Sequence, residues 1–208
     1  MTSIGDLILS FGFLIIAITV HEFSHGFVAY KLGDNTAKYS GRLSLNPLAH
    51  IDPFGTIILP ILLYFTTGGR FVFGYAKPVP VNTMALGHPK RDIGFVSLAG
   101  PLSNITFAFL LSLLVRFLHL PGASNYFLVS LININVILGV FNLLPIPPLD
   151  GSGILISLLP QRLAIIYSSL ERYGFILLIV LILFNITDYF VWPLVRLILN
   201  FMLGGVSI

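Results

Sequence analysis

The sequence predicts an all-α polytopic membrane protein, with about five transmembrane helices, a short re-entrant or interfacial segment and short β-type linkers at the membrane surface. Two observations carry this prediction. Hydrophobic residues make up 56% of the 208 residues and charged residues only 9%, whereas about 25% of the residues of a soluble domain are charged. The apolar residues also form runs that approach or exceed the roughly 20 residues a helix needs to cross a bilayer.

The predicted spans follow from these runs in chain order. Residues 54–65 are too few to cross and include Pro60, so this segment is expected to re-enter the membrane or to lie at its surface. No basic stretch precedes the first apolar run. This run is therefore expected to be a transmembrane helix that is retained in the mature protein, and not a cleavable signal peptide. The five expected spans are residues 4–30, 93–120, 126–144, 163–186 and 189–203.

The linkers on either side of the short segment have an unusual composition. Residues 31–53 and 66–90 contain glycines, prolines and the short β-type runs 71–73 and 79–81. Such backbone survives at membrane depth only where it is buried in protein or lines water. We therefore expect irregular chain or a short hairpin at the membrane surface.

The most informative motif, His21-Glu22-Phe23-Ser24-His25, lies inside the first apolar run. Residues four apart share one face of a helix, so the two imidazoles can hold one Zn²⁺ while Glu22 reaches the metal-bound water as a base. A charged side chain at the centre of a bilayer costs roughly 2.5–3.5 kcal/mol, and a metal would compensate Glu22. The alternative is a hydrogen-bonded cluster inside a helical bundle.

Asp150 is the candidate for a third ligand. The chain has no cysteine, so the metal ligands must be His, Asp or Glu. Pro145, Pro147 and Pro148 precede Asp150 and cannot continue a regular helix, so the fourth span must unwind there and can aim the carboxylate inward. The alternative is an ordinary turn at Asp150-Gly151, which is common after prolines.

The basic residues predict the orientation in the membrane. If residues 54–65 turn back, one side holds eight of the eleven basic residues and is cytoplasmic by the positive-inside rule. The N-terminus is then outside, the C-terminus inside, and His21, His25 and Asp150 lie at similar depth. If residues 54–65 instead cross the membrane, the basic residues are divided between the two sides and the charge asymmetry weakens. The eight residues are Lys31, Lys38, Arg42, Arg70, Lys77, Lys90, Arg91 and Arg162.

These motifs together resemble the site-2 protease family, the intramembrane zinc metalloproteases of peptidase family M50. The resemblance rests on residues 21–25, on Leu149-Asp150-Gly151 and on Asn142, eight residues before that aspartate. Residues 100–104 resemble the family's GxxxN element and end in Asn104. Residues 41–47 and 77–82 resemble linkers of its small bacterial and archaeal branch. The likeness extends from about residue 10 to 155.

The resemblance implies a function and a set of site residues. Zinc would be held by His21, His25 and Asp150, one ion per chain, with Glu22 as general base and later proton donor. Asn142 resembles a residue that supports the substrate or the oxyanion, and Asn104 a structural or substrate-positioning residue. The substrate would be a transmembrane protein, trimmed beforehand by another protease and cut within or near its membrane span.

The resemblance also implies one integral-membrane domain over residues 1–208, with a catalytic core at about 5–155 and C-terminal helices at about 163–206. Only residues 121–125 separate the third and fourth spans, which leaves no room there for a PDZ domain, and no CBS domain follows. The expected location is a prokaryotic cytoplasmic membrane, with the active site toward the cytoplasm. The lipid bilayer is an expected partner, a homo-oligomer is left open, and the net charge of +3 argues for no nucleic acid.

Two other function classes remain at this stage. An inactive membrane-binding protein could retain the fold, although the intact motif argues against it. A metal transporter could use the same groups for transit, but transporters usually show repeated halves and several intramembrane carboxylates. The membrane proteases that act on prenylated proteins take a glutamate as third ligand, and the only other glutamate, Glu171, lies in no matching motif.

Overall fold

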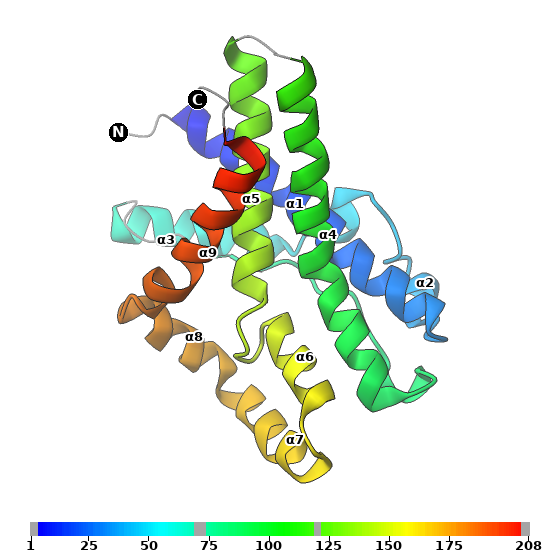
Figure 1. Cartoon of the computed structure of the whole chain (residues 1–208). Helices are drawn as coiled ribbons and strands as arrows, with labels where there is room; N and C mark the ends of the chain where they lie inside the picture. The colour runs from blue at the N-terminus through cyan, green and yellow to red at the C-terminus, as the bar shows by residue number, and fades with distance from the viewer. Residues whose placement is uncertain (1–3, 69–73, 119–121, 205–208) are drawn as a thin grey trace.

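The computed structural model describes residues 4–68, 74–118 and 122–204, and within these residues all regular secondary structure is helical, with no β-strand (Figure 1). The prediction of an all-α polytopic fold is confirmed. The elements are α1 (Ile4–Lys31), α2 (Thr36–Tyr39), η1 (Pro47–Ala49), η2 (Pro53–Ile58), α3 (Leu59–Thr67), η3 (Thr83–Ala85), α4 (Pro89–Leu118), α5 (Gly122–Asn142), α6 (Asp150–Leu158), α7 (Gln161–Ser168), η4 (Ser169–Tyr173), α8 (Gly174–Leu183) and α9 (Ile186–Leu203).

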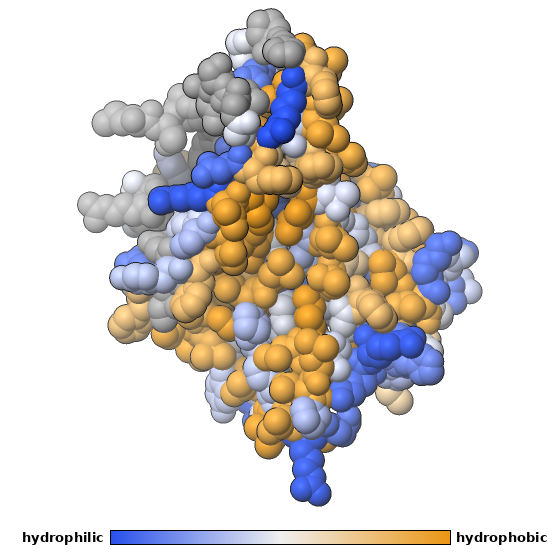
Figure 2. Space-filling view, in the orientation of Figure 1, coloured by the Kyte–Doolittle hydropathy of each residue, from blue (hydrophilic) through white to orange (hydrophobic). Residues whose placement is uncertain are grey.

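Four helical stretches of the described chain, not five, are long and apolar enough to cross a membrane. They are Ile8–Lys31, Pro89–Leu118, Gly122–Asn142 and Gln161–Leu181. The last predicted span, 189–203, is a shorter apolar helix. At 1.5 Å per residue it covers only about 22 Å of a hydrocarbon core that is about 30 Å thick. Apolar side chains cover most of the face seen in Figure 2, as expected of an integral membrane protein.

Helix α4 is the centre of the fold. It packs against α1, α5 and α6, and Figure 1 shows α4 and α5 side by side with α1 crossing behind them. A Cβ on Gly139 of α5 would lie 3.0 Å from the carbonyl oxygen of Pro101. The close contact between α4 and α5 therefore depends on glycine at this position. Buried Val136 and Val195 extend the same core to α9.

The C-terminal helices differ from the expected topology. Arg116, near the end of α4, donates hydrogen bonds to the carbonyls of Phe201 (2.6 Å) and Met202 (2.8 Å) near the end of α9. The opposite end of α4 packs on α6, where a Cβ on Gly94 would meet the Ser157 hydroxyl. Residues 161–203 therefore run from the end of the bundle near α6 to the opposite end, near Arg116. The end of α9 therefore lies at the end of the bundle opposite the start of α4, which differs from the arrangement expected from the sequence.

The short apolar segment leaves the linker and returns to it. The segment begins with a π-helical turn, η2, and continues as α3, which lies across the bundle in Figure 1. The amide of Tyr75 donates to the carbonyl of Gly55 (3.0 Å), and the Thr56 hydroxyl donates to the carbonyl of Tyr75 (2.8 Å). The start of the segment therefore lies beside the chain that follows it, as the re-entrant prediction requires.

The two linkers are joined to each other by buried side chains. The Arg42 guanidinium donates to the carbonyls of Ala49 and Lys77, and the Lys77 amide donates to the carbonyl of His50 (3.0 Å). The linkers therefore lie at the same end of the bundle. Residues 79–81 form irregular chain and not a strand, and residues 71–73, the other predicted β-type run, lie outside the described residues.

Asp34 fixes the far end of the second linker. Its carboxylate is buried and accepts hydrogen bonds from the hydroxyl and amide of Thr36 and from the amide of Asn82 (2.7 Å). Burial opposes ionisation of Asp34, but these three donors outweigh it and hold its pKa below the usual range. The contact therefore stabilises the folded linkers at neutral pH. That stabilisation is lost only when the pH falls below about 4 and through the lowered pKa.

Candidate metal centre

His21, His25 and Asp150 meet in the interior of the bundle. The Nε2 atom of His21 lies 2.9 Å from one carboxylate oxygen of Asp150, and the Nε2 atom of His25 lies 3.3 Å from the other. The three ligand atoms all lie within 4.8 Å of one another. Ligands of a tetrahedral zinc ion at about 2.0–2.1 Å are separated by about 3.3 Å. The predicted three-residue cluster therefore has the dimensions of a zinc site.

The hydrogen bonds of the two imidazoles leave their lone pairs pointing at the carboxylate. The Nδ1 atom of His25 lies 2.7 Å from the carbonyl of Val96, which can only accept, so this nitrogen carries the proton. The Nδ1 atom of His21 lies 2.7 Å from the side-chain oxygen of Asn104, and the same reasoning applies. In the neutral rings both Nε2 atoms are then hydrogen-bond acceptors, and both face the Asp150 carboxylate, which is also an acceptor. A cation between these groups removes that repulsion, so the donor set fits a divalent metal.

Gly100 allows the imidazoles to approach α4. A Cβ at this position would lie 2.4 Å from the Nε2 atom of His25 and 2.6 Å from that of His21. Asn104 lies one turn further along the same face of α4. The Gly-x-x-x-Asn element thus combines a space for two rings with a hydrogen-bond acceptor for one of them.

Asp150 reaches the site because α5 ends before it. The chain leaves α5 after Asn142, runs through the prolines as irregular backbone and re-enters a helix at Asp150, the first residue of α6. Gly151 packs on this irregular turn, and a Cβ there would lie 2.3 Å from the carbonyl oxygens of Leu143 and Leu144. Packing against this backbone therefore requires glycine at position 151, and the preceding Asp150 faces the two imidazoles.

Comparison with known proteins agrees with this geometry. Over 192 residues the chain is 39% identical to the protein named "Putative zinc metalloprotease YwhC" of Bacillus subtilis (strain 168), covering 88% of this chain and 84% of that one. Over 209 residues it is 31% identical to "Putative zinc metalloprotease Rip2" of Mycolicibacterium smegmatis, covering 100% of this chain and 78% of that one. The model of peptidase family M50 matches residues 120–184, which include Asp150. The chain belongs to peptidase family M50. No solved structure matches it.

Membership of family M50 identifies the metal as zinc, which His21, His25 and Asp150 would hold here. Three protein ligands leave a fourth position for water or substrate, as in catalytic zinc sites. Glu22 lies next to His21 in sequence and is not a member of the cluster. Its Oε2 atom accepts a hydrogen bond from the Val79 amide (2.7 Å), so the second linker fixes the carboxylate beside the metal centre.

The two asparagines expected to support the substrate occupy different places. Asn104 is fully buried, and its side-chain oxygen lies 2.7 Å from Nδ1 of His21, so it contacts a metal ligand in this M50 protein. Asn142 donates to the carbonyl of Leu138 in its own helix (3.0 Å) and, among the described residues, bonds to no metal ligand. It lies at the end of α5 beside the turn that carries Asp150, so the structure leaves its predicted role untested.

Asn135 and Gly100 contribute to the site without having been predicted as functional residues. Asn135 is fully buried on α5 and accepts from the Asn104 amide (2.8 Å). A lone asparagine in an apolar helix gives no indication of what it faces. For Gly100, the spacing from Asn104 in the Gly-x-x-x-Asn element is the one sequence signal that points to its role.

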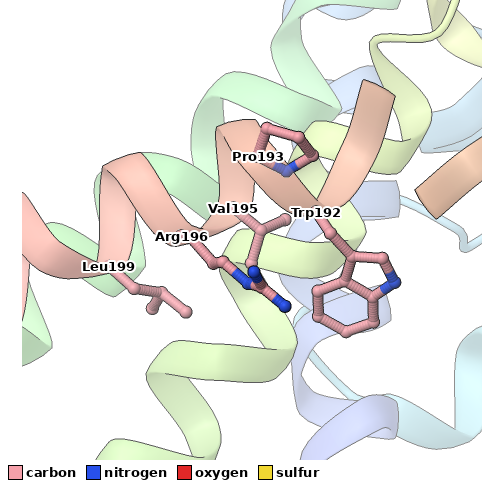
Figure 3. Close-up of a pocket in the computed structure, with 5 residues that line it drawn as sticks. All are labelled: Trp192, Pro193, Val195, Arg196 and Leu199. Atoms are coloured by element: carbon pink, nitrogen blue, oxygen red, sulfur yellow. The ribbon is translucent and has the colours of Figure 1, made fainter. Parts of the chain in front are cut away.

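A pocket of about 430 Å³ lies away from the metal centre, along α9. Figure 3 shows its lining, Trp192, Pro193, Val195, Arg196 and Leu199, all on this one helix. None of these residues contacts His21, His25 or Asp150 through a hydrogen bond or ion pair in the described structure. We assign this pocket no part in the chemistry.

Proposed function

We propose that this protein is an intramembrane zinc metalloprotease, which hydrolyses peptide bonds within or near the transmembrane segments of other membrane proteins. The observation that carries this proposal is the position of the metal centre in the bundle. His21 and His25 belong to α1, a helix long and apolar enough to span a membrane. His21 lies ten residues before Lys31 at the end of that helix, or about 15 Å along its axis.

A bound zinc ion supplies a positive charge that polarises a peptide carbonyl and lowers the pKa of water to about 7. The proton transfers are left to residues of the protein itself. In this proposal Glu22 would take a proton from water and deliver it to the amine that leaves when the peptide bond breaks. Its Oε2 atom is held by the Val79 amide, and its Oε1 atom makes no hydrogen bond in the described structure, which leaves one oxygen for the proton.

The substrate in this proposal is a transmembrane protein that another protease has already trimmed. A peptide bond inside a helix is shielded by side chains and by the helix hydrogen bonds, so the substrate must unwind locally before cleavage. Glycines, prolines and polar residues in its span would ease the unwinding. The relatives come from bacteria and an archaeon. These sources and the positive-inside rule support a prokaryotic cytoplasmic membrane, with the basic linkers on the cytoplasmic side.

Comparative membrane proteomics would test the function and name the substrate. Cells carrying the wild-type protein are compared with cells carrying Glu22→Gln, and the control is Glu171→Gln, the same chemical change at the only other glutamate, which is exposed. We expect uncut, trimmed transmembrane fragments to accumulate with Glu22→Gln alone. Identical fragment profiles for all three proteins would contradict a protease and favour a binding or transport role.

A further inference from the structure

A chain of buried amides connects the metal centre to α5. The side-chain NH₂ of Asn104 donates to the carbonyl of Ala17 on α1 (2.9 Å) and to the side-chain oxygen of Asn135 on α5 (2.8 Å). The NH₂ of Asn135 donates in turn to the carbonyl of Leu131 (2.8 Å). Both asparagines are fully buried, so water does not compete for these bonds. Helices α1, α4 and α5 are thereby linked through two side chains.

The backbone carbonyls that this hydrogen-bond network contacts determine which group donates and which accepts in each of its hydrogen bonds. A backbone carbonyl can only accept, so the carbonyl of Leu131 requires the NH₂ of Asn135, which turns the oxygen of Asn135 toward Asn104. That oxygen and the carbonyl of Ala17 both require the NH₂ of Asn104. The oxygen of Asn104 then has to face His21.

The orientation of Asn104 decides which nitrogen of His21 carries its proton. With the oxygen of Asn104 at 2.7 Å, the Nδ1 atom of His21 is protonated and the Nε2 atom offers its lone pair toward Asp150. If the amide of Asn104 turned over, its NH₂ would require a lone pair on Nδ1. The proton would then move to Nε2 and remove the ligand. A neutral imidazole binds a metal only through an unprotonated nitrogen.

We propose that Asn135 is a positioning residue of the zinc site, which acts through Asn104 to hold the amide orientation and thus the metal-binding tautomer of His21. The assignment rests on the metal centre of the proposed function and not on proteolysis. Outer partners of metal-ligating histidines typically contribute 10–100-fold in metal affinity. Asn135 is one hydrogen bond further from His21 than Asn104 is, so its effect on zinc affinity belongs near the lower end of that range.

The test measures zinc affinity of the full-length protein in detergent by competition with a chelator. Asn135→Leu removes the acceptor and should weaken zinc binding about 10-fold. Asn135→Asp keeps an oxygen for the amide of Asn104 and should stay within about 3-fold of wild type. The matched control is Ser112→Ala on α4, which removes a buried hydroxyl whose one hydrogen bond in the described part of the chain goes to Phe109 of its own helix (2.7 Å). This control should bind zinc as the wild type does.

A second readout separates positioning from general destabilisation. With cobalt in place of zinc at full occupancy, the visible spectrum reports the ligands directly. We expect an altered spectrum for Asn135→Leu and unchanged spectra for Asn135→Asp and Ser112→Ala. If Asn135→Leu does not fold, Asn135→Ser, whose shorter side chain cannot reach Asn104, takes its place. Wild-type zinc affinity in the variant without the acceptor, or equal losses for Leu and Asp, would overturn the assignment. A protein without protease activity would leave these results interpretable.

Discussion

At the scale of single residues, the site depends as much on small side chains as on the metal ligands. The two imidazoles pack directly on the backbone of α4, and Gly100 has no spare room: any Cβ would lie within 2.6 Å of both rings. Gly12, in contrast, has no such neighbour. A Cβ on Gly12 of α1 would meet nothing within 4 Å. The two glycines thus form a matched pair for mutagenesis.

Gly100→Ala should weaken zinc binding by at least about 10-fold, because the new methyl group displaces both histidines from their ligand positions. Gly12→Ala should leave zinc affinity unchanged and raise helix stability slightly, since alanine favours a helix over glycine by about 0.5–1 kcal/mol. Chelator competition and thermal unfolding of both purified variants measure the two effects. Equal zinc affinity in the two variants would show that the rings do not pack on α4 as described.

The three ligands give a second prediction at this scale. The purified protein should contain about one zinc per chain, because three ligands converge on one site. Changing His21, His25 or Asp150 to Ala should lower the zinc content, as elemental analysis would show. An Asp150→Ala protein with full zinc and full activity would remove Asp150 from the site.

At the scale of elements, the second linker holds Glu22, the proposed general base, in place. Residues 77–82 are held at one end by Arg42, whose guanidinium reaches the carbonyls of Lys77 and Pro78, and at the other by Asp34. Val79 lies between these two contacts and donates its amide to Glu22. Arg42 is buried and has only carbonyl partners in the described structure, so its contribution is to the path of the linker.

Arg42→Gln should therefore reduce the rate of cleavage without removing the metal. Glutamine keeps one donor but cannot reach both carbonyls, so the linker loosens and Glu22 loses its fixed orientation. We expect kcat to fall about 10-fold, which is less than the 10²–10⁴-fold that a general base contributes because Glu22 itself is still present, while zinc content stays at the wild-type level. Lys90→Gln, a loss of one exposed positive charge, is the control. If Arg42→Gln lost zinc together with activity, the linker would be supporting the metal site as a whole.

Sequence patterns predicted the parts of the site that are local or carry rare residue types. The spacing of His21 and His25 fixes their common face on a helix, and three prolines before Asp150 must end α5 wherever it packs. The contact between Asn104 and Asn135 depends on how two apolar helices rotate against each other, which their hydropathy does not determine. Hydropathy likewise could not predict the orientation of α9, because an apolar run does not by itself show which way its helix runs in the bundle.

At the scale of the whole molecule, the linkers and the end of α9 lie at opposite ends of the helical bundle. The linkers contact each other through Arg42 and the carbonyl of His50, so they share one side. The last turn of α9 lies beside Arg116, at the other end of α4. Figure 1 shows this turn (red) at the same height as the start of α1 (blue).

Cysteine labelling should reveal this arrangement, because the chain has no cysteine of its own. Cysteines replacing Lys38 and Lys77 should react with a membrane-impermeant thiol reagent from the cytoplasmic side of oriented vesicles. A cysteine added after Ile208 should react from the opposite side. Opposite reactivity at positions 38 and 77 would mean that residues 54–65 cross the membrane, and a C-terminal cysteine on the linker side would place α9 differently from the structure.

The central claim is that a zinc site and an adjacent carboxylate cleave peptide bonds in the membrane. Glu22→Gln separates the two, because it preserves the shape of the side chain and leaves His21, His25 and Asp150 in place. The most direct measurement is the cleavage rate of a helical membrane substrate in liposomes, with zinc content determined on the same preparations. We predict normal zinc and substrate binding with cleavage at least about 100-fold slower, and wild-type behaviour for Glu171→Gln. Cleavage by Glu22→Gln at near the wild-type rate would contradict the account.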